Sequence, residues 1–125
     1  EWNGMRLHEL YFGNLTKESS PLNAQSSLAQ SIAERFGSIE VWEKDFRMAG
    51  AMRGIGWVAL VCDEERLFNV WINEHDGGHL AGATPLLVMD VFEHAFMLDY
   101  GLKRADYIDT FFRSIDWQAV ERRLQ

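Results

Sequence analysis

An apolar run that ends in a carboxylate, with a histidine four residues later, constrains the fold of this chain more than any other feature. Five uncharged residues, Pro85 to Met89, come directly before Asp90, and His94 follows Asp90 at a spacing of four. The run predicts a buried strand, and the residues after it predict a helix. Residues four apart on a helix project from the same face. The spacing therefore places both side chains on one face, in a geometry that can bind a metal.

The same spacing has a second interpretation as an ordinary charged pair on a solvated helix face, where such a pair contributes only about 0.2–0.5 kcal/mol. The neighbours of the pair are apolar, among them Met89, Val91 and Phe92. A buried aspartate and a buried histidine must be paired, hydrogen-bonded or coordinated to a cation. At this point a neutral structural pair and a metal site both remain open.

Hydrophobic periodicity along the chain predicts an α+β fold, with a small three-stranded antiparallel sheet covered by helices and a helical N-terminal appendage. A glycine after each apolar helical pattern marks its end, and Ser38 is the expected cap of the third helix. The predicted helices are 2–15 (ending near Gly13), 24–36, 39 to the Gly54/Gly56 pair, and most of 91–124, and the predicted strands are 57–62, 67–72 and 85–90.

The charge of the chain excludes some partners. The net charge is −7 and no basic run occurs, whereas nucleic acids and anionic membranes are bound through clustered Lys and Arg. No apolar stretch approaches the ~20 residues of a membrane-spanning helix, and no charged segment followed by an apolar one has the pattern of a secretory leader. We therefore expect a soluble, cytoplasmic protein with neither nucleic-acid nor membrane partners. The single cysteine, Cys62, follows an apolar run and is expected to be a buried, unreactive thiol.

Residues 90–100 resemble the C-terminal signature of the iron/manganese superoxide dismutases. The family usually reads D-x-W-E-H-A-Y-Y-L-x-Y there, and this chain reads D-V-F-E-H-A-F-M-L-D-Y. Further segments resemble the family in the same order along the chain, namely residues 8–15, 36–39, 54–57, 104–107 and 115–117. The resemblance implies an antioxidant enzyme that disproportionates superoxide at one iron or manganese ion.

The resemblance also implies the metal ligands. His8, Asp90 and His94 match three of the four protein ligands of the family, and the fourth is a histidine on a helix that precedes the segment of His8. Only seven residues come before His8, and Glu1 is not an initiator residue. We therefore expect a fragment, a processed product or a truncated chain, with weak or absent activity. By the same resemblance, residues 1–36 are the remainder of an N-terminal helical domain and residues 37–125 are the C-terminal domain.

Other residues match positions that surround the metal in this family. His75 lies where the family supplies an outer-sphere Gln or His that tunes the metal, with His79 as the alternative and exposed loop histidines as the simpler interpretation of both. His75 slightly favours iron over manganese. Trp57 is retained beside the site, and Phe92 replaces a tryptophan of the family.

Glu93 matches a glutamate that reaches the ligand histidine, here His94, of a partner subunit, and so implies a homodimer. The simpler interpretation of Glu93 is a surface residue. An anionic substrate and an acidic chain would need a local positive charge for steering, and Arg104, which matches an arginine of the family, and Lys103 are the best candidates. A structural ion pair of Arg104 is an equal alternative.

Two further functions are compatible with these residues. The first is a non-catalytic, structural member of the same fold without a metal, which the departures from the family pattern favour. The second is a metallohydrolase with a zinc-activated water, because a three-ligand site would leave one position open. The second function lacks an obvious general base apart from Glu93.

Overall fold

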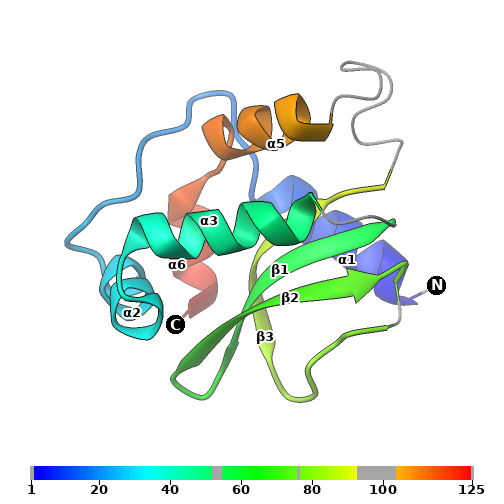
Figure 1. The fold of residues 1–125 in the computed structure, drawn as a ribbon, viewed down its shortest axis with the longest axis horizontal. Coiled ribbons are helices and arrows are strands. Elements are labelled where there is room, and N and C mark those ends of the chain that lie inside the picture. The colour runs from blue at the N-terminus through cyan, green and yellow to red at the C-terminus, as the bar shows by residue number, and fades with distance from the viewer. Residues whose placement is uncertain (1, 52–54, 76, 93–103, 125) are drawn as a thin grey trace.

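The computed structural model describes residues 2–51, 55–75, 77–92 and 104–124. Within these ranges the chain forms five helices and three strands, which confirms the predicted α+β class. In chain order they are α1 (Trp2–Gly13), α2 (Ser27–Phe36), α3 (Ile39–Gly50), β1 (Gly56–Asp63), β2 (Arg66–Asn73), β3 (Thr84–Asp90), α5 (Arg104–Arg113) and α6 (Trp117–Leu124) (Figure 1). None of the helices in these ranges is long and apolar enough to cross a membrane.

The three strands form one antiparallel sheet in the order β2-β1-β3. β1 and β2 are joined by a tight turn at Glu64 and Glu65, where Glu64 takes a φ of 60°. On β1, Trp57 pairs with Ile72 of β2 on one side and with Asp90 of β3 on the other. The central strand therefore brings Trp57 and Asp90 to the same end and the same face of the sheet.

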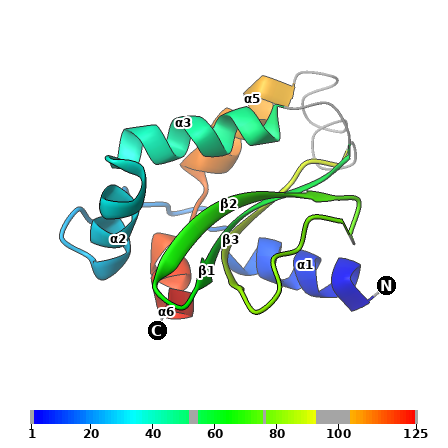
Figure 2. The ribbon, with the colours of Figure 1, turned by 60° about the horizontal axis from the view of Figure 1, so that its bottom comes forward.

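Helices cover both faces of the sheet, as Figure 2 shows: α3 and α5 lie above the sheet in that view, and α1 lies below it. Both faces of β1 and β3 are consequently buried, and the residues Leu86 to Met89 are fully shielded from solvent. α1 packs against β3, and Leu7 and Tyr11 of α1 belong to the buried core. The helix that carries His8 thus lies on the strand that ends at Asp90.

Serine caps set the beginnings of two helices. Ser38 Oγ accepts the Val41 N–H at 3.1 Å, as predicted. Ser26 Oγ accepts the Ala29 N–H at 3.1 Å, so α2 begins at Ser27 and the predicted start at residue 24 was wrong. A side-chain oxygen satisfies one of the free N–H groups of the first turn, and neither Ala24 nor Gln25 supplies one. α3 ends at Gly50, before the predicted glycine pair, and residues 52–54 lie outside the described ranges.

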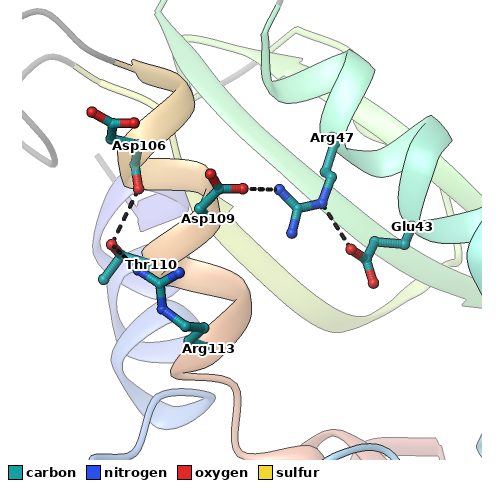
Figure 3. A network of polar contacts seen from close by, with 6 residues as sticks. All are labelled: Glu43, Arg47, Asp106, Asp109, Thr110 and Arg113. Carbon is teal, nitrogen blue, oxygen red and sulfur yellow. Dashed lines mark hydrogen bonds and ion pairs between the residues drawn. The ribbon is translucent and has the colours of Figure 1, made fainter.

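A polar network on the upper layer ties α3 to α5 (Figure 3). Arg47 of α3 donates to Glu43 Oε2 at 2.8 Å and to Asp109 Oδ1 of α5 at 2.5 Å. Its guanidinium also lies 4.4 Å from the centre of the Phe112 ring. Burial acts to lower the pKa of Arg47, but the bonds to the two carboxylates outweigh it and raise the pKa. The network is partly exposed, so each ion pair contributes little to stability.

Cys62 is half-buried rather than buried, which corrects the prediction from the sequence. The apolar run of β1 leaves the core at its last two residues, where the strand turns into β2. The Cys62 thiol donates to the Glu64 carbonyl at 3.0 Å. Its pKa is raised by partial burial and by the charges of Asp63 and Glu65. Because the thiolate is the reactive form, these surroundings favour an unreactive thiol.

Candidate metal centre

Asp90 is held in one orientation at the end of β3. It is only 1% exposed, and its Oδ1 accepts the N–H of Phe92 at 2.9 Å. A side-chain bond to the backbone two residues on turns the chain out of the strand. The turn fixes one carboxylate oxygen, so the other oxygen, Oδ2, has a defined direction. Oδ2 is directed at His8 of α1.

His8 presents its Nε2 to this carboxylate at 3.7 Å from Asp90 Oδ2. The other ring nitrogen, Nδ1, donates to the Gly4 carbonyl at 2.8 Å, one helical turn earlier. A carbonyl oxygen can only accept, so in the neutral ring Nδ1 carries the proton and Nε2 carries the lone pair. This tautomer is the one in which Nε2 can bind a metal.

The two groups fit a shared cation. Two ligand atoms that each lie about 2.1 Å from one ion can be at most about 4.2 Å apart, and the 3.7 Å between His8 Nε2 and Asp90 Oδ2 lies within that limit. A nitrogen lone pair and a carboxylate oxygen repel each other unless a proton or a cation lies between them. Imidazole and carboxylate are suitable donors for iron and manganese.

His94 and Glu93 lie outside the described ranges. Among the residues that are described, no group of three or more His, Cys, Asp or Glu side chains comes together as a metal site. The structure thus brings together two of the three predicted ligands, and the assignment of His94 stays a prediction.

His75 lies beside this pair, in contact with both predicted aromatic neighbours. The Trp57 indole N–H donates to His75 Nδ1 at 3.0 Å, and Phe92 stacks on the His75 ring at 4.9 Å between centroids. Trp57 also meets the His8 ring edge-on at 4.8 Å. His79 is exposed, and its Nε2 lies 2.6 Å from the carbonyl oxygen of His75. The geometry supports His75 over His79 as the outer residue.

Gly4 is a site residue that reasoning from the sequence missed. A Cβ added to it would lie 3.2 Å from the His75 ring, which is closer than ordinary contact. Glycine within a helix costs about 1 kcal/mol relative to alanine, and this cost was the only signal in the sequence. The missing side chain makes room for His75 against α1.

Replacing Gly4 by alanine is expected to displace His75 without unfolding the chain. The helix gains a better helix former, but the added methyl group pushes the His75 ring away from the Trp57 N–H. The expected result is a changed NMR resonance of the Trp57 indole N–H, because it loses its acceptor. Met5→Ala, on the exposed side of the same helix, is the control and should leave that resonance in place. An unchanged resonance in the Gly4 variant would contradict this packing.

Arg104 is bound to backbone carbonyls. Its guanidinium donates to the carbonyls of Gly50, at the end of α3, and Val91, just after β3, each at 3.5 Å. The second of these carbonyls belongs to the residue that directly follows Asp90, so the Arg104 guanidinium lies near the end of β3. These bonds are compatible with a structural role and leave steering of the substrate as a proposal. Lys103 lies outside the described ranges.

Comparisons with known proteins agree with this geometry. Residues 24–123 match the family described as iron/manganese superoxide dismutases, C-terminal domain. The chain is 38% identical over 125 residues to "Superoxide dismutase [Mn] 2" of Haloferax volcanii, covering 98% of this chain and 62% of the relative. It is 39% identical over 125 residues to "Superoxide dismutase [Fe]" of Cupriavidus metallidurans, covering 97% and 61%.

A third relative is shorter and is therefore covered more completely. "Superoxide dismutase [Mn] 1" of Haloferax mediterranei is 41% identical over 107 residues, which cover 84% of this chain and 73% of the relative. The chain spans about three fifths of the length of the first two relatives. The resemblance seen in the sequence is thereby confirmed, and the chain belongs to the iron/manganese superoxide dismutase family, of which it carries the C-terminal portion.

Proposed function

We propose that the protein formed by this chain disproportionates superoxide at a single iron or manganese ion held by His8, Asp90, His94 and one further ligand. The observation that carries the proposal is the buried Asp90 carboxylate, which faces the metal-binding tautomer of His8 at 3.7 Å. Asp90 Oδ1 is held by the Phe92 N–H, so its Oδ2 keeps a fixed direction toward His8. The names of the relatives indicate which chemistry such a cation would serve.

The residues of the chain would prepare the site for that chemistry. A bound iron or manganese ion would supply the one-electron oxidation and reduction of superoxide. Asp90 contributes the negative charge that balances the ion, and the Gly4 carbonyl fixes the ring of His8. His75 accepts at Nδ1 from Trp57, so its neutral ring holds a proton at Nε2, on the side of α1. From there it can donate a hydrogen bond within the site and so influence the reduction potential.

Three finer statements belong to the same proposal. Iron is slightly favoured over manganese because of His75, while the relatives carry names of both metals. Glu93 would reach His94 of the partner subunit in a homodimer. Arg104 would attract the superoxide anion toward a chain of net charge −7. The cytoplasm is the proposed location.

Measuring metal content tests the proposal first. The chain is purified without added metal or chelator, and iron and manganese are counted by elemental mass spectrometry. Near one ion per chain, together with dismutation of superoxide, would show that the ligands of this chain suffice, whereas weak or absent activity is the expected result for the chain alone. A low metal content would be followed by adding the N-terminal portion found in the longer relatives, which should raise both metal content and activity. No gain from that addition would favour a structural member of the fold without a metal.

A further inference from the structure

A polar cluster with a buried centre and a partly exposed arginine joins α1, β3 and α6. At its centre, Asn14 follows the last turn of α1 and is fully buried. The Asn14 side chain pairs with Val88 of β3 in both directions, accepting its N–H at 2.9 Å and donating to its carbonyl at 3.2 Å. Asn14 thus pairs with the outer edge of β3 as a neighbouring strand would.

Arg123 of α6 donates hydrogen bonds to three acceptors in the same cluster. Its guanidinium donates to Asn14 Oδ1 at 3.1 Å, to the Leu86 carbonyl of β3 at 2.9 Å and to the Leu10 carbonyl of α1 at 2.8 Å. All three acceptors are uncharged. Burial lowers the pKa of Arg123, with further lowering from the charges of Arg6 and Arg122. The fixed fork of an arginine suits three acceptors on separate elements better than the single ammonium of a lysine does.

The cluster lies close in sequence to both His8 and Asp90, on the same helix and the same strand as these two residues. Asn14 lies six residues after His8, about 9 Å along a helix. Val88 lies two residues before Asp90, about 7 Å along a strand. A site that binds through defined geometry tolerates displacements of only about 0.5 Å, and a slip of α1 by one residue would move His8 by about 1.5 Å. The hydrogen bonds that join α1 to β3 at Asn14 and Arg123 therefore set the distance between His8 and Asp90.

We propose that Asn14 and Arg123 are positioning residues for the metal site: they fix the register of α1 against β3 and thereby the distance from His8 to Asp90. This proposal rests on the proposed function, since it assigns a purpose to that distance. The two residues lie 109 positions apart in the sequence, and their side chains bond to each other and to Val88, Leu86 and Leu10. Their effect on the metal would be transmitted entirely through the backbone of α1 and β3.

The first experiment needs no metal. The His8 ring protons lie against the Trp57 ring, so ring currents shift their NMR signals. Arg123→Lys keeps the charge but loses the fork, and it should move the His8 signals toward those of a free histidine. Arg122→Lys, the same change at an exposed position of α6, should not. Unchanged His8 signals in folded Arg123→Lys would overturn the proposal.

A second variant keeps the experiment decisive if Arg123→Lys fails to fold. A Cβ on Gly13 would lie 2.9 Å from Arg123 Nη2, so Gly13→Ala displaces the guanidinium while improving helix propensity. A smaller shift of the His8 signals in the same direction is expected. Gly13→Ala with unchanged His8 signals and a displaced guanidinium would contradict the proposal.

The third measurement is the affinity for Mn²⁺. Binding is detected as a loss of the electron paramagnetic resonance signal of the free ion. Arg123→Lys should bind Mn²⁺ about tenfold or more weakly than the unaltered chain, the usual cost of losing a residue that supports a ligand. Phe46→Leu, in the α3 layer and destabilised to a similar extent, should keep its affinity. Equal losses in both variants would show a merely structural role. No Mn²⁺ binding even after the N-terminal portion of the longer relatives is added would contradict the proposed function, and the His8 signals would still decide the positioning proposal.

Discussion

Replacing Asp90 by asparagine is expected to weaken Mn²⁺ binding by more than about 100-fold, since loss of a residue that only supports a ligand already costs about 10–100-fold. Asparagine has the same shape, and its Oδ1 can still accept the Phe92 N–H, so the fold is retained. The negative charge opposite His8 Nε2 is lost. A titration with Mn²⁺, followed by the resonance signal of the free ion, measures the change.

Asp106→Asn is the matched control. Asp106 is exposed on α5, and its replacement by asparagine removes the same charge at a position away from the site. It should leave Mn²⁺ affinity unaltered. Asp90→Ala and His94→Ala are expected to abolish specific metal retention in the same way. If the iron or manganese content of the Asp90 variants equals that of the unaltered chain, the ligand assignment is wrong.

Replacing Trp57 by alanine is expected to lower the free energy of unfolding by about 3–5 kcal/mol, the usual cost of truncating a large buried aromatic side chain. Trp57 is 0% exposed and contacts both His8 and His75. Domains have a total stability of about 5–15 kcal/mol, so the variant would be close to unfolding. Denaturant titration followed by far-ultraviolet circular dichroism measures the loss.

Two further variants separate packing from the hydrogen bond of Trp57. Trp57→Phe keeps most of the apolar volume but removes the indole N–H that binds His75, so it should cost less stability than alanine while releasing His75. Trp2→Ala is the control, because Trp2 is 68% exposed and its loss should change stability by less than about 0.5 kcal/mol. Similar losses in Trp57→Ala and Trp2→Ala would contradict the packing described for Trp57.

Much of the fold could be predicted because it depends on local patterns. The apolar runs of β1, β2 and β3 each fall within a strand of the structure, and Ser38 caps α3 as expected. Boundaries were less accurate where a specific side chain decided them. α2 begins after Ser26 because Ser26 supplies the capping oxygen, and the helix-compatible residues before it do not.

Burial at the ends of elements could not be predicted from the same patterns. Cys62 continues the apolar run of β1, yet it lies where the strand leaves the core and turns toward Glu64. Hydrophobic periodicity records which residues suit an interior, but the length of the covering helices decides how far the interior extends. In α1, likewise, the periodicity of the sequence does not show how far along the helix burial extends; the structure shows Leu7 and Tyr11 in the core.

The sequence by itself determined the types of side chain at the candidate site, the strand that ends at Asp90 and the helix that carries His8. Only the tertiary structure decided that Gly4 makes room for His75 and that Asn14 and Arg123 lock α1 to β3. These contacts join residues 71 to 109 positions apart. Their existence depends on the register in which packed elements meet, and local propensity and spacing carry no information about that register.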